Sequence, residues 1–61
     1  MARPNRAVAY IRHSISTMAQ REEWWKIDGM IELACHLDKI TEIQAEELTA
    51  ELEEAYDNLD C

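Results

Sequence analysis

Few residues of this 61-residue chain have the types and spacing of a catalytic or metal site. Glu32 and His36 stand one helical turn apart, but zinc needs three or four ligands, and no HExxH or CxxC spacing is present. Cys35 falls on the apolar side of its segment, where a thiol is an inert space-filler. The Ser/Thr-rich residues 14–17 have no His–Asp partners in a recognisable motif. We therefore predict a protein that is not an enzyme and that uses no metal or cofactor.

Trp25 is the residue best suited to binding. On a helical projection it falls in a polar sector beside Glu32 and His36, and Gly29, one turn further on, leaves a notch next to it. A large aromatic side chain in such a place is typical of an interface anchor. The plainer interpretation is that another helix or a second protomer packs over it. The predicted partner-binding residues are Trp25, Glu32, His36, Tyr10 and Arg12.

Charge is distributed unevenly along the chain. The first 21 residues carry four arginines and no acid, whereas the remaining residues carry all 13 acids and two lysines, for a net charge of −7. The simplest interpretation is that the basic segment pairs with acidic ones, within the chain or across a dimer. An alternative is weak, salt-sensitive binding of nucleic acid through Arg3, Arg6 and Arg12.

The acidic residues near the C-terminus support a further alternative. They form two flanks of a predicted helix, one of them with Glu46, Glu53 and Asp57 and the other with Glu47, Glu51 and Glu54. Rows of carboxylates can occupy the basic channel of a nucleic-acid-binding protein, as a mimicking inhibitor of the phage or mobile-element type does. We assign that alternative mimic face to Glu47, Glu51 and Glu54. Dense glutamate on a helix is otherwise a solvated surface.

The clearest element that positions these residues is a helix over about residues 42–58. Thr41 is a good N-cap, and Gln44 completes a capping box. Apolar residues then recur in alternating steps of three and four, which places them on one narrow stripe. They are Ala45, Leu48, Leu52, Ala55 and Leu59.

A second helix, about residues 22–38, is apolar over more than half of its circumference, so it is either central or shared with a second protomer. Gly29 is unfavourable inside a helix, and close packing is the expected reason for it. An alternative is a turn at Asp28–Gly29 that divides the element. A first helix is expected over about residues 5–19. Its apolar stripe is out of phase with that of the second helix, which predicts a loop or kink near residues 19–23. A continuous helix over about 5–38 is the alternative.

These elements predict one all-α domain over residues 1–61, with two or three helices. The second and third form an antiparallel helical hairpin that homodimerisation completes, because such a short chain buries little core of its own. We expect Ile31, Ala34, Leu37, Leu48 and Leu52 in the core.

The expected role is therefore a small accessory or regulatory module that docks on or occludes a partner protein. The apolar run at residues 7–11 stops at Arg12, too short for a signal-peptide core or a membrane span. Cys35 and Cys61 do not make a disulfide framework. We expect a cytoplasmic protein whose partners are a second copy of itself and an unidentified protein, with no membrane contact and at most weak contact with nucleic acid.

Overall fold

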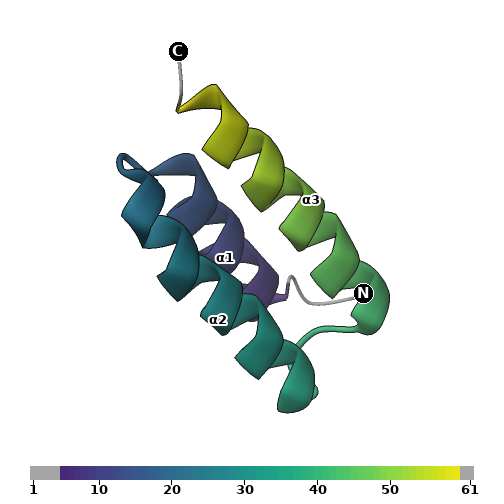
Figure 1. The fold of residues 1–61 in the computed structure, drawn as a ribbon. Helices are drawn as coiled ribbons and strands as arrows, with labels where there is room; N and C mark the ends of the chain where they lie inside the picture. Colours follow the sequence, from purple (N-terminus) through teal and green to yellow (C-terminus); the bar gives the residue numbers. More distant parts are fainter. Residues whose placement is uncertain (1–4, 60–61) are drawn as a thin grey trace.

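Residues 5–59 are described by the structure, a computed structural model. Within this range three α-helices follow one another, namely α1 (Arg6–Ser16), α2 (Trp24–His36) and α3 (Glu42–Asn58), and a short 3₁₀ turn, η1 (Arg21–Glu23), precedes α2. Residues 5–59 contain no strand, so the all-α class is confirmed. Helix α3 packs against both α1 and α2, and α1 also contacts α2 (Figure 1).

Polar side chains begin two of the helices. The Asn5 side-chain oxygen accepts from the backbone N–H groups of Ala7 and Val8 at the start of α1. At α3, the Gln44 N–H donates to Thr41 Oγ1 at 3.1 Å and the Thr41 N–H donates to Gln44 Oε1 at 2.9 Å, which confirms the predicted capping box. Asn5 Nδ2 also donates to the Lys39 carbonyl at 2.8 Å, so the start of α1 is held against the α2–α3 loop.

A short irregular segment, residues 17–20, separates α1 from η1 and α2. The hydroxyls of Ser16 and Thr17 both donate to the His13 carbonyl, a local contact that competes with continuation of the helix. Beyond them the Ala19 N–H donates to a Glu23 carboxylate oxygen at 2.8 Å, and Met18 is buried. The structure thus has two helices here in place of one continuous helix, and neither Gly nor Pro takes part in the break.

Helix α2 ends in a Schellman motif. Asp38 has a φ of 60°, the Lys39 N–H donates to the Ala34 carbonyl and the Asp38 N–H donates to the Cys35 carbonyl. Leu37 is the last residue before this turn, one helical turn beyond the exposed Leu33 on the same side of α2, and it is 56% exposed. The prediction that Leu37 is a core residue is therefore wrong.

The core is a single apolar cluster to which all three helices contribute. Leu48 and Leu52 of α3 are fully buried, and Ile31 is almost so, as predicted, whereas Ala34 is only half-buried. The buried residues are Ile11, Ile15, Met18, Ile27, Ile31, Ile40, Leu48 and Leu52. None of the polar or charged residues within 5–59 is buried, so apolar contact stabilises the fold.

Gly29 lies in the open. An ideal Cβ at this position would have no atom of the neighbouring elements within 4 Å. The expectation that close packing explains this glycine is therefore wrong for the packing within the chain. Helix α2 continues through residues 28 and 29, so the alternative of a turn is also contradicted.

Candidate functional site

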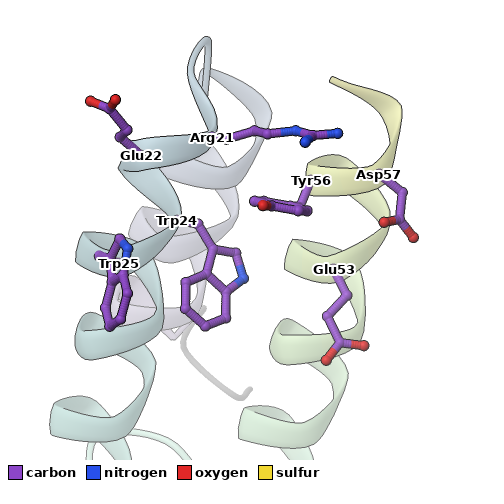
Figure 2. Close-up of a pocket in the computed structure, with 7 residues that line it drawn as sticks. All are labelled: Arg21, Glu22, Trp24, Trp25, Glu53, Tyr56 and Asp57. Carbon is purple, nitrogen blue, oxygen red and sulfur yellow. The ribbon is translucent and has the colours of Figure 1, made fainter. Parts of the chain in front are cut away.

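The aromatic pocket is a cavity of about 490 Å³ between the start of α2 and the end of α3. Its lining residues are Arg21, Glu22, Trp24, Trp25, Glu53, Tyr56 and Asp57 (Figure 2). Both tryptophans of the chain are among them. Rings and carboxylates thus share a cavity that is open to solvent.

Ring contacts position the side chains of the pocket. The Trp24 ring meets Trp25 edge-on, with centroids 5.6 Å apart, and Tyr56 across the helix interface, with centroids 6.3 Å apart. The Arg21 guanidinium carbon lies 4.9 Å from the centroid of the Tyr56 ring. Trp25 is 75% exposed, since only Trp24 packs against the core. The Trp24 side of the pocket is therefore held by the core, whereas the Trp25 side faces solvent.

A second hollow of larger volume, which we call the interhelical groove, adjoins this pocket between α2 and α3. It measures about 810 Å³, and Glu53 lines both cavities. Its floor includes Ile31, Cys35 and Ala45, and its walls carry carboxylates. These carboxylates belong to Asp28, Glu32, Glu42, Glu46 and Glu53. The groove is thus apolar at its base and acidic at its rim.

The five predicted partner-binding residues do not form one site. Trp25 lines the aromatic pocket, and Glu32 and His36 line the interhelical groove, so these three share the α2–α3 face. Tyr10 lines a smaller hollow between α1 and α2, and Arg12 lies at the α1–α3 interface. The projection placed Trp25, Glu32 and His36 in one polar sector, whereas Tyr10 and Arg12 belong to another helix and lie on other faces of the bundle.

Arg12 is paired with the acids of α3. Its Nε lies 3.2 Å from a Glu51 carboxylate oxygen, and its NH2 nitrogen lies 4.0 Å from Glu47. Arg12 thus joins the basic first helix to the acidic last one. This contact agrees with the simplest interpretation of the charge pattern, in which the basic segment pairs with acidic ones. Of the alternative mimic face, only Glu54 remains without this contact, and of the alternative nucleic-acid set, Arg6 is exposed while Arg3 lies outside the described residues.

Sequence reasoning missed the partners of Trp25 in the aromatic pocket. No binding role was assigned to Trp24 or Tyr56. Trp24 and Tyr56 are each 16 residues from Ile40, in the loop between the two helices. When two helices pack against each other and are joined by a tight loop, residues at the same sequence distance from that loop lie beside each other. The equal spacing of Trp24 and Tyr56 from Ile40 is therefore the sequence signal that could have identified the pocket.

The described part of the chain was also searched for metal-binding clusters and for membrane-spanning helices. No group of three or more His, Cys, Asp or Glu residues within 5–59 is placed to hold a metal ion. No helix in this range is long and apolar enough to cross a membrane. Comparison of the chain with protein-family models, with curated proteins and with solved structures gave no match.

Proposed function

We propose that this chain is a non-enzymatic protein–protein interaction module, an accessory or regulatory protein that docks on or occludes a partner protein. The observation that carries the proposal is the exposure of Trp25 at the rim of the aromatic pocket. Tryptophan is on average a highly buried residue and is enriched among residues that dominate binding energy at interfaces. An exposed indole beside a cavity suits insertion into, or coverage by, another protein.

Affinity capture from the native host tests this docking role. Wild-type protein and a Trp25→Ala variant are immobilised, and the retained proteins are compared by mass spectrometry. Ile43→Ala is the matched control, because Ile43 is also a large exposed apolar residue and lines none of the three hollows described above. We expect a partner that binds wild type and Ile43→Ala and is lost with Trp25→Ala. Equal retention by all three proteins would refute the docking role of Trp25.

We further propose that α2 and α3 act as an antiparallel helical hairpin whose outer α2 side is covered by a second copy of the chain. Leu33 and Leu37 project from that side and are exposed. Light scattering over a dilution series measures the mass, which should be that of a dimer at micromolar concentration. Leu33→Glu should shift it to a monomer, whereas Ile43→Glu should not. A folded wild-type monomer at that concentration would contradict the proposal.

The acidic mimic remains a second candidate function, and the carboxylates along the interhelical groove support it. Asp28 and Glu32 belong to α2, and Glu42, Glu46 and Glu53 belong to the flank of α3 that faces the groove. Arg12 pairs with Glu47 and Glu51 of the mimic face assigned above, so this candidate uses the groove carboxylates, which make no ion pair with Arg12. Weak contact of nucleic acid with the N-terminal arginines is a third candidate, tested by mobility shift at low salt. We place the protein in the cytoplasm, where the free thiol of Cys35 stays reduced.

A further inference from the structure

The aromatic pocket has the chemistry of a cation site. Aromatic faces attract ammonium and guanidinium groups, tryptophan most strongly, and the attraction grows when the cation is partly desolvated. Here two indoles and the Tyr56 ring surround a cavity whose wall also carries Glu53 and Asp57. Rings and carboxylates together favour a group that is both flat and positively charged.

The chain already contains one such contact. The guanidinium of Arg21 lies over the Tyr56 ring at 4.9 Å, on one side of that ring. In Figure 2, Arg21 is above Tyr56 and Glu53 is below it, with Trp24 facing the same lower space. A second guanidinium entering from below would meet the Trp24 ring and the Glu53 carboxylate. Arginine suits this position better than lysine, because its planar group stacks on rings and binds carboxylates through two N–H donors.

The interhelical groove extends this chemistry along the molecule. Its acidic rim runs from Glu42 to the pocket at Tyr56, which is roughly 21 Å at the rise of an α-helix. A helix of about 14 residues has the same length. The apolar floor at Ile31 and Ala45 suits the apolar stripe of an amphipathic segment, and the rim suits its basic residues.

We propose that the partner is held through a basic amphipathic segment, with one arginine side chain in the aromatic pocket and the rest of the segment along the interhelical groove. This inference rests on the proposed docking function and names the chemistry of the partner. The charge asymmetry of α3 supports it, because Arg12 pairs with Glu47 and Glu51 on the opposite flank. The flank facing α2 presents its carboxylates to the groove.

A synthetic peptide tests this assignment directly. The probe is an amidated helix-forming peptide of alanine and leucine, about 14 residues long, with arginine at every third or fourth position. Its twin carries citrulline, the neutral analogue of arginine, at the same positions. Both tryptophans line the pocket, so tryptophan emission of the intact chain reports occupancy. We expect saturable binding of the arginine peptide, weakened by added salt, and none of the citrulline twin.

Neighbouring glutamates provide matched variants with the same change of charge. Glu53 lines both cavities, whereas Glu54 lines neither, and both are exposed residues of α3. Glu53→Gln should weaken the arginine peptide about 2- to 5-fold, and Glu54→Gln should leave its affinity unchanged. Trp25→Ala, read through Trp24 emission, should weaken it roughly tenfold. Circular dichroism verifies that each variant keeps its helical content.

Equal binding of the arginine and citrulline peptides, or equal affinity of Glu53→Gln and Glu54→Gln, would overturn the proposal. Neither result touches the docking role of Trp25, which the capture experiment decides with the natural partner. Conversely, capture that does not depend on Trp25 would refute the proposed function, whereas the peptide titration would still measure the arginine site separately. Self-association that Glu53→Lys abolishes and Glu54→Lys leaves intact would assign the groove to a second copy and also overturn the proposal.

Discussion

Replacing Gly29 with alanine is expected to stabilise the protein, which is unusual for a change in the middle of a helix. Gly29 has a negative φ and lies within α2. An added Cβ meets no atom of the neighbouring elements within 4 Å, so no steric penalty offsets the gain in helix propensity. Alanine is more favourable than glycine in a helix interior by about 1 kcal/mol, and serine by roughly half of that.

Thermal unfolding followed by circular dichroism measures this gain. A change of about 1 kcal/mol corresponds to a rise in Tm of about 4–8 °C for a domain near this size. Gly29→Ser should give an intermediate Tm, which checks that propensity is the cause. An unchanged or lowered Tm for Gly29→Ala would refute the reasoning. A loss of stability that grows with protein concentration would show that a second copy approaches Gly29 closely.

Three further changes test the ends of the helices and the charge pairing. Asp38→Gly should raise the free energy of unfolding by about 1 kcal/mol, because Asp38 has a φ of 60°, and an unchanged urea midpoint would contradict this. Thr41→Ala should lower it by about 1 kcal/mol, because the capping box with Gln44 is lost; a midpoint equal to that of wild type would show that the cap is dispensable. A double-mutant cycle of Arg12→Ala and Glu51→Gln should give a coupling of about 0.5 kcal/mol that falls with added salt, and a salt-independent coupling would argue against a solvated pair.

The part of the fold that sequence reasoning identified best is α3. Its stripe from Ala45 to Leu59 lies in or against the core, and the Thr41 cap has the predicted partner in Gln44. Both signals are local, because spacing along one helix and a contact over three residues need no knowledge of other elements. The side of α2 that faces the core was harder to identify. Since apolar residues cover more than half of its circumference, periodicity does not say which part faces the core, and Leu37 lies one turn beyond Leu33 on the outer side, where both are exposed.

The candidate site was harder to predict because it depends on how two helices are placed relative to each other. Trp25 could be recognised from its own helix, whereas the aromatic pocket depends on which residues α3 places opposite it. Tyr56 reaches the Trp24 ring only because the loop around Ile40 is tight and both helices pack along their length. Likewise the pairing of Arg12 with Glu51 spans 39 positions and depends on which flank of α3 faces α1. Projection of a single helix does not contain that information.

The Asn5 contact to the Lys39 carbonyl makes the two ends of the bundle unequal in their dynamics. At the loop end, directional hydrogen bonds between side chains and backbone groups tie the start of α1 to the α2–α3 loop and cap the start of α3, and backbone bonds close the Schellman turn. At the opposite end, ring contacts between Trp24 and Tyr56 join α2 to α3, and such contacts tolerate small displacements. Amide hydrogen exchange should therefore increase from the loop end towards the aromatic end. The aromatic pocket can then adapt its shape through local opening while the rest of the bundle stays closed.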